Sequence, residues 1–171
     1  MDDFRDKSSS ASRKGKAAEL LVAAHCILVS GGQLNVSTSY VDDEGVDLVF
    51  HARGSAAILA VQVKTRFTTS SVYGRGQITA DVRAQTFAVR EDLAMLFAVV
   101  DDQQGRLVHV WLVPSADFAA HAMTVGAKQK LRFAASTRAD SADKWTRYRL
   151  EPAQLPARVL EILTGLDASG R

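Results

Sequence analysis

The sequence has few of the features that mark secreted and membrane proteins. Its single cysteine, Cys26, cannot form a disulfide within the chain, which excludes a disulfide-stapled secreted domain. No apolar run reaches the roughly 18 residues that are needed to span a bilayer. Residues 1–16 are polar and lack the apolar core of a signal peptide. We therefore expect a cytoplasmic protein that makes no contact with a membrane.

The chain also has little net charge. Its 21 Lys and Arg residues nearly balance 19 Asp and Glu residues, and the resulting net charge of +2 excludes a polybasic protein. An anionic partner therefore has to bind a local cationic patch and not the surface as a whole.

The composition is that of an ordinary globular protein. The chain has 171 residues, of which 47% are hydrophobic and 23% charged, enough for one substantial core. We expect residues 1–12, which are polar and serine-rich, to form a flexible tail, and residues 13–171 to form a single domain. An Ala- and Leu-rich helix is predicted over residues 13–30, ended by Gly31 and Gly32. Because it is apolar nearly all round, this helix is predicted to be largely buried.

Short segments with β character fill most of the remaining chain. Gly54 and Ser55 predict an antiparallel hairpin, and the turn at 101–105 predicts a second one. A third hairpin is predicted near the C-terminus, around the polar turn at 137–143. The predicted strands cover residues 35–41, 46–52, 57–66, 94–102, 106–114, 128–136 and 144–151.

The other segments complete the predicted order of elements. Residues 67–77 are expected to form a surface loop, and residues 78–92 a strand start followed by a short helix. A short helix is predicted from Ser115 and a closing helix from near Pro152. Helices and strands in this order predict an α/β or α+β fold with a mixed sheet.

Three polar residues interrupt the apolar strands. Because side chains alternate along a strand, Gln62 and Lys64 share one face, opposite to Val61 and Val63. Asp47 likewise faces away from its apolar neighbours, and the hairpin can bring it beside Gln62 and Lys64. Each of them has a simpler explanation as a solvated residue, but together they favour a functional site.

Oxygen ligands suited to a hard divalent cation accompany this cluster. Glu19 is the only Asp, Glu, Lys or Arg between Ala17 and Ser30, and a carboxylate in a buried helix needs a compensating cation or hydrogen bonds. Mg²⁺ or Mn²⁺ could be held by Asp47, the Gln62 amide oxygen, the Val63 backbone carbonyl and Glu19. Lys64 could then orient or deprotonate the attacking water and neutralise charge at a phosphate.

The sequence resembles the PD-(D/E)xK nuclease superfamily at these positions. The resemblance is carried by Glu19, by Gly-Val-Asp at 45–47 and by Gln-Val-Lys at 62–64, and it is greatest to Holliday-junction-resolvase-like and small prokaryotic members. It implies a restriction-endonuclease-like αβββαβ core with a central mixed sheet, followed here by a C-terminal β-hairpin and helix. It further implies Mg²⁺-dependent hydrolysis of DNA, with Asp47 as central metal ligand, Lys64 as catalytic lysine and Glu19 as helix acid.

Position 62 departs from the common pattern of this superfamily, which has Asp or Glu there. Gln62 supplies a neutral ligand in place of a charged one. Two alternatives to a nuclease therefore stay open, namely an inactive nucleic-acid-binding module of the same fold and a structural or interaction protein.

Cationic residues supply a candidate DNA-binding surface. Alternation along the two last predicted strands places basic side chains on one face, which could contact phosphates or could protect a sheet edge from pairing. Further arginines flank the loop beside the site. The sequence does not decide between a monomer and a homodimer. The predicted DNA contacts are Arg66, Arg75, Lys128, Lys130, Arg132, Arg147 and Arg149.

Overall fold

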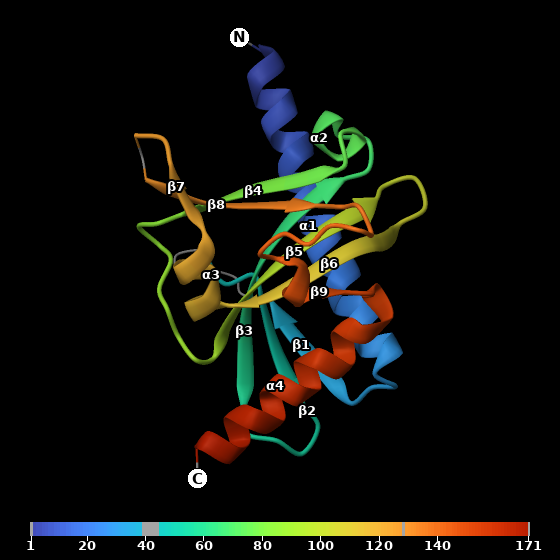
Figure 1. The fold of residues 1–171 in the computed structure, drawn as a ribbon. Helices are drawn as coiled ribbons and strands as arrows, with labels where there is room; N and C mark the ends of the chain where they lie inside the picture. The colour runs from blue at the N-terminus through green and yellow to red at the C-terminus, as the bar shows by residue number, and fades with distance from the viewer. Residues whose placement is uncertain (1, 39–44, 128, 171) are drawn as a thin grey trace.

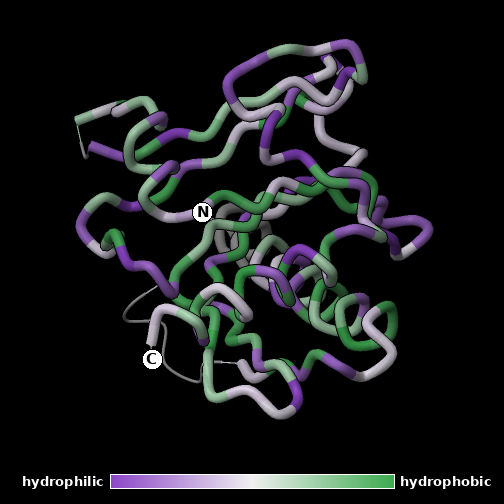
Figure 2. Tube along the Cα trace, turned by 60° about the horizontal axis from the view of Figure 1, so that its bottom comes forward, coloured by the Kyte–Doolittle hydropathy of each residue, from purple (hydrophilic) through white to green (hydrophobic). Residues whose placement is uncertain are grey.

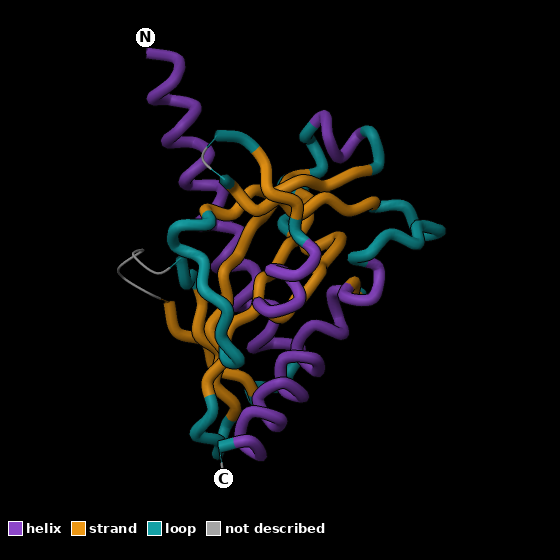
Figure 3. The backbone as a smooth tube through the Cα atoms, turned by 60° about the vertical axis from the view of Figure 1, so that its left-hand side comes forward, coloured by secondary structure: helices purple, strands orange, loops and turns teal. Residues whose placement is uncertain are grey.

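The fold is built around a six-stranded mixed sheet with strand order β1-β2-β3-β5-β6-β9 (Figure 1). The computed structural model describes residues 2–38, 45–127 and 129–170. Figure 3 shows the strands in the centre of the molecule, with helices and loops around them. The strands of this sheet are β1 (Leu34–Thr38), β2 (Leu48–Ala52), β3 (Ile58–Phe67), β5 (Leu93–Asp101), β6 (Arg106–Pro114) and β9 (Arg149–Leu150).

A smaller sheet and the helices complete the structure. The smaller sheet has the strand order β4-β8-β7. Its strands are β4 (Gln77–Arg83), β7 (Met123–Val125) and β8 (Lys130–Ser136). The helices are α1 (Asp2–Val29), α2 (Ser71–Gly74), α3 (Ser115–His121) and α4 (Leu155–Ser169), with 3-10 turns η1 (Thr146–Tyr148) and η2 (Pro152–Gln154). In the described part of the chain, no helix is long and apolar enough to cross a membrane.

Helix α1 is longer and more exposed than the sequence predicted. It begins at Asp2 and not at Arg13, because residues 2–12 contain neither Pro nor Gly to stop it, so the predicted tail carries helical backbone. Its first turns project from the body of the molecule (Figure 1). Ala18, Val22 and Cys26 form its buried face, whereas Leu20 and Leu28 are 54% and 77% exposed. The prediction of a largely buried helix is therefore wrong, since only one face packs on the sheet.

The two predicted hairpins that build the central sheet are confirmed. β2 pairs antiparallel with β3 across a turn in which Gly54 has a φ of +78°, and β5 pairs antiparallel with β6. β3 and β5 then pair in parallel, with Gln62 opposite Met95 and Lys64 opposite Phe97. The chain between them leaves this sheet and forms α2 and β4. β4 confirms the predicted strand start, but residues 84–92 form turns and irregular backbone in place of the predicted short helix.

The predicted C-terminal hairpin is wrong. β8 pairs with β4 and β7 in the smaller sheet, while β9 pairs with the edge of β6 in the central sheet. Burial explains the difference, because Phe133 on β8 and Trp145 after it are both fully buried in the core beneath the smaller sheet. The closing helix is present as α4, with Pro156 in its first turn.

Two apolar cores lie on opposite faces of the central sheet. One face packs against α1 and α4 through residues such as Leu48, Val61 and Val63. The other face packs against the smaller sheet and α3, and the Phe97 and Phe133 rings stack there with centroids 3.8 Å apart. Figure 2 shows the hydrophobic stretches gathered in the middle of the molecule. The smaller sheet is therefore fixed over the β3–β5–β6 part of the central sheet.

Candidate active site

Asp47 is held beside the middle of β3 by backbone hydrogen bonds. Its N–H donates to the Val61 carbonyl over 3.0 Å, which extends the pairing of β2 with β3 by one step. Its carboxylate Oδ2 accepts the N–H of Val63 over 2.6 Å. These two bonds fix the Asp47 side chain next to the positions that carry Gln62 and Lys64.

Asp47, Gln62 and Lys64 line one cavity of about 250 Å³, called the small cavity below. Gln62 is only 9% exposed, and a Cβ added to Gly45 would lie 2.8 Å from its Nε2 atom. Gly45 has a φ of +69°, so both the backbone and the space at this position favour glycine. The other residues lining the small cavity come from the smaller sheet and the turn after β4, namely Asp81, Arg83, Thr86 and Lys130.

Glu19 lies in a second hollow, which shares a wall with the small cavity. This groove, called the α1 groove below, has a volume of about 800 Å³ and runs between α1 and β3, with Asp47, Val63 and Lys64 in its lining. The Glu19 carboxylate accepts from the Lys16 ammonium over 2.8 Å, and its side chain is 17% exposed. The structure thus brings Glu19 to the same strand segment as the other three residues, on the α1 side.

The carboxylates of this region are few. In the described ranges, no three His, Cys, Asp or Glu side chains come close enough together to hold a metal ion. Asp42, Asp43 and Glu44 precede the site in sequence and lie outside the described residues. Among the described residues, Asp47 and Glu19 are the predicted carboxylate ligands, and with neutral oxygens and water they make a ligand set that Mg²⁺ accepts.

The smaller sheet adds a charged residue that the sequence prediction missed. Asp81 lines the small cavity, and both of its oxygens accept from the Arg132 guanidinium, at 2.7 and 2.9 Å. Its hydrogen bond with Arg132 lowers the pKa of Asp81, so this carboxylate is anionic at neutral pH. The polar residues Thr79, Asp81 and Arg83 alternate with buried ones along β4, and this period of two was the signal available in the sequence.

Electrostatics also distinguish Arg66 among the predicted DNA contacts. Arg66 lines the α1 groove, and burial lowers its pKa while the charge of Asp81 raises it. Its Nη1 donates to the Thr65 carbonyl over 2.9 Å. Arg66 is thus a partly desolvated cation near the C-terminal end of β3, two residues after Lys64.

The predicted two-stranded basic face is not formed. β8 and β9 belong to different sheets, so their basic residues do not lie side by side. Lys130 lines the small cavity, Arg132 is paired with Asp81, and Arg149 donates to His109 and to the carbonyls of Thr137 and Arg138. Arg147 belongs to η1 and not to a strand, Arg75 is the C-cap of α2, and Lys128 lies outside the described residues.

Comparison with known proteins supports the fold. No protein-family model and no protein of curated function matches this chain. Its structure is similar to that of a bacterial homing endonuclease, I-Ssp6803I, with a TM-score of 0.57 and 16% sequence identity. The similarity covers 92% of this chain and 96% of the other. The predicted α/β architecture with a central mixed sheet is therefore confirmed, and the chain has a nuclease-like fold.

Proposed function

We propose that the protein is a metal-dependent DNA endonuclease of the PD-(D/E)xK type. The observation that carries this proposal is the convergence of Asp47, Gln62 and Lys64 on the small cavity, with Glu19 on the adjoining wall. The fold similarity to a homing endonuclease points to the same class of activity.

The proposed metal is Mg²⁺, with Mn²⁺ as a substitute. Asp47 and the Gln62 amide oxygen would hold it, assisted by the Val63 carbonyl and by Glu19, and these oxygen donors fit a hard cation that keeps several waters. When bound, such an ion would activate a water and stabilise the charge that develops on a phosphate.

Each residue of the site would have a distinct role in the reaction. The Val63 N–H holds the Asp47 carboxylate in one orientation, so that this ligand is in place before substrate binds. The Lys64 ammonium, which borders both hollows, would attract the scissile phosphate and orient the attacking water. Gln62 would complete the ligand set without adding charge.

Gln62 also favours a second candidate function, a DNA-binding module that has lost hydrolysis. The neutral amide replaces the carboxylate that the superfamily pattern has at this position, and it weakens the attraction of the site for a cation. Both candidates expect salt-dependent binding of DNA, but only the nuclease expects cleavage that requires metal.

The substitution Gln62→Glu separates these candidates. It keeps the shape of the side chain and adds a charged ligand, so we expect the Mg²⁺ concentration for half-maximal cleavage to fall by about tenfold, which corresponds to about 1.4 kcal/mol of binding free energy. The measurement is a titration of cleavage with Mg²⁺ on supercoiled, linear and branched DNA. A wild type that binds these DNAs but cleaves none of them with Mg²⁺ or Mn²⁺ would leave the binding module as the function.

The substitution Gly45→Ala tests the position of Gln62. The added Cβ would lie 2.8 Å from the amide nitrogen, so Gln62 has to move, and the left-handed backbone costs about 1–2 kcal/mol of folding free energy for an L-residue. Gly54→Ala is the matched control, because Gly54 also has a positive φ but its Cβ would meet nothing within 4 Å.

We expect thermal unfolding to show a similar loss of stability in both glycine variants. Cleavage should fall by about tenfold or more in Gly45→Ala, through the displaced ligand, and stay near the wild-type rate in Gly54→Ala. Equal cleavage rates in the two variants would mean that the placement of Gln62 does not matter to the reaction.

A further inference from the structure

The α1 groove gathers cationic side chains from two elements of the fold. Lys14 and Lys16 enter it from α1, and Lys64 and Arg66 from β3. Glu19 and Asp47 are the acidic residues in its lining, so its described lining has four cations against two carboxylates. Hydroxyl groups of Ser12 and Thr65 add neutral donors of the kind that contact phosphate oxygens.

Two of these cations form ion pairs in which the lysine side chain is exposed to solvent. Lys14 contacts Asp102 and Lys16 contacts Glu19, each over 2.8 Å, and the two lysine side chains are 50% and 53% exposed. Exposed ion pairs contribute only about 0–1 kcal/mol. The ammonium groups lie at the surface and can contact an incoming polyanion, whereas the carboxylates of Asp102 and Glu19 are only 19% and 17% exposed.

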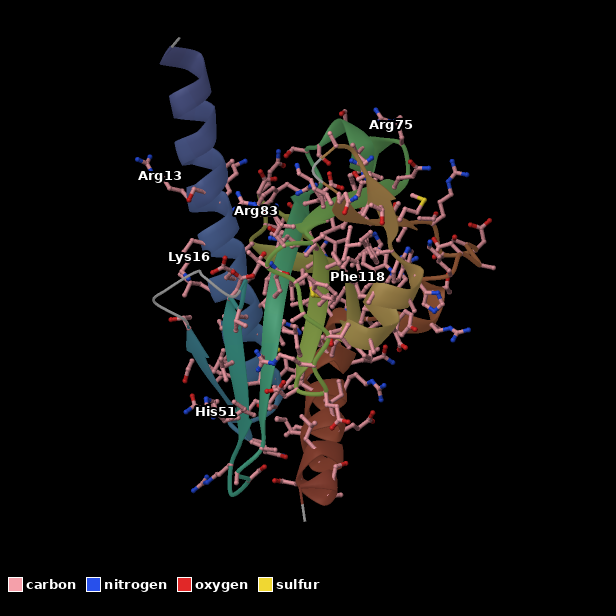
Figure 4. All side chains as sticks on the ribbon, turned by 90° about the vertical axis from the view of Figure 1, so that its left-hand side faces the viewer. Arg13, Lys16, His51, Arg75, Arg83 and Phe118 are labelled. Carbon is pink, nitrogen blue, oxygen red and sulfur yellow. The ribbon has the colours of Figure 1, made fainter. Side chains whose placement is uncertain are left out.

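The groove is continuous with the candidate active site. Asp47 and Lys64 line both the α1 groove and the small cavity, so a phosphate placed at Lys64 has the groove on one side of it and the cavity on the other. In Figure 4 Lys16, which lines the α1 groove, is seen on α1, and Arg83, which lines the small cavity, is seen toward the centre of the molecule. A groove of this volume, lined by four cations from α1 and β3, suits an extended chain of phosphates.

We propose that the α1 groove binds the sugar–phosphate backbone of one DNA strand as it leads into the active site, with Lys14 and Lys16 contacting its phosphates. This inference rests on the proposed function in taking DNA as the partner, but it does not depend on metal or on cleavage. It assigns strand binding to α1 and the end of β3. Of the contacts predicted from the sequence it includes Arg66, but not those on the two last strands.

The test is DNA binding by Lys14→Gln and Lys16→Gln in EDTA. Fluorescence anisotropy of a labelled duplex, measured over a range of salt concentrations, gives the slope of log affinity against log salt. Each phosphate contact contributes about 0.9 to this slope, so each variant should reduce it by about one. The affinity itself should fall severalfold at low salt.

Arg158→Gln is the matched control. Arg158 lies on α4, forms an i,i+3 ion pair with Glu161 over 2.9 Å and is 49% exposed. The substitution removes the same charge as Lys16→Gln from a cation of similar exposure, although Glu161 is more exposed than Glu19. We expect this variant to keep the wild-type slope. Thermal unfolding of all three variants confirms that each is folded.

The outcomes separate the groove from the nuclease activity. If both lysine variants keep the wild-type slope while the wild type binds DNA, the strand lies elsewhere and the proposal is overturned. If the lysine variants show a smaller salt slope and the wild type cleaves no DNA with metal, the groove proposal is supported and the nuclease proposal is overturned. A wild type without affinity for DNA would overturn both.

Discussion

Asp47→Asn is expected to lower the rate of metal-dependent DNA cleavage by about 10²- to 10⁴-fold. The substitution removes the carboxylate charge at the centre of the proposed site, and metal ions and preorganised charges contribute several kcal/mol to transition-state stabilisation. The Asn oxygen can still accept the N–H of Val63, so the local structure should persist. The measurement is the initial rate of plasmid nicking with saturating Mg²⁺.

Asp47→Ala serves as the structural comparison. It also removes the acceptor for the Val63 N–H, and a buried donor without a partner costs about 1–3 kcal/mol of stability. Both variants should lose cleavage, but only the alanine variant should lose stability, and DNA binding in EDTA should persist or strengthen in both. Near-normal cleavage by Asp47→Asn would exclude Asp47 as the central metal ligand.

The second large effect concerns stability. Phe97→Ala should lower the free energy of unfolding by about 3–5 kcal/mol, because it leaves a cavity in a closely packed interior. Phe97 is fully buried, stacks on Phe133 of the smaller sheet and lies 5.5 Å from Phe118 of α3 between ring centroids. Urea unfolding measures the change, with Phe97→Leu as a control that should cost less because it leaves a smaller cavity.

This core position also affects the site. Phe97 pairs with Lys64 in the register of β3 and β5, and its ring anchors the sheet that carries Asp81 and Arg83 over Gln62. A loss of less than about 1 kcal/mol in Phe97→Ala would show that the two sheets do not depend on this stack. The wall of the small cavity would then have to be held by other contacts.

The site residues on β3 and at Asp47 were predicted from patterns within one hairpin. Strand alternation placed Gln62 and Lys64 on one face, and the turn at Gly54 set Asp47 beside them. These features are local, so sequence spacing was sufficient to find them. Glu19 was found because a carboxylate stands out in an apolar helix.

The missed part depends on contacts between segments distant in sequence. Nothing in the residues of β8 shows that it pairs with β4 and not with the next strand along the chain. The choice follows from the burial of Phe133 and Trp145 beneath the smaller sheet, which is a property of the folded core. For the same reason Asp81 was missed, and the cations of β8 and β9 were assigned to one surface.

The two walls of the small cavity also differ in how far apart their contacts lie along the chain. The bond from Val63 to Asp47 spans 16 residues, whereas the pair of Arg132 with Asp81 spans 51. Because the entropic cost of closing a loop rises with its length, the hairpin that carries Asp47, Gln62 and Lys64 can form early, and the wall from the smaller sheet closes over it later.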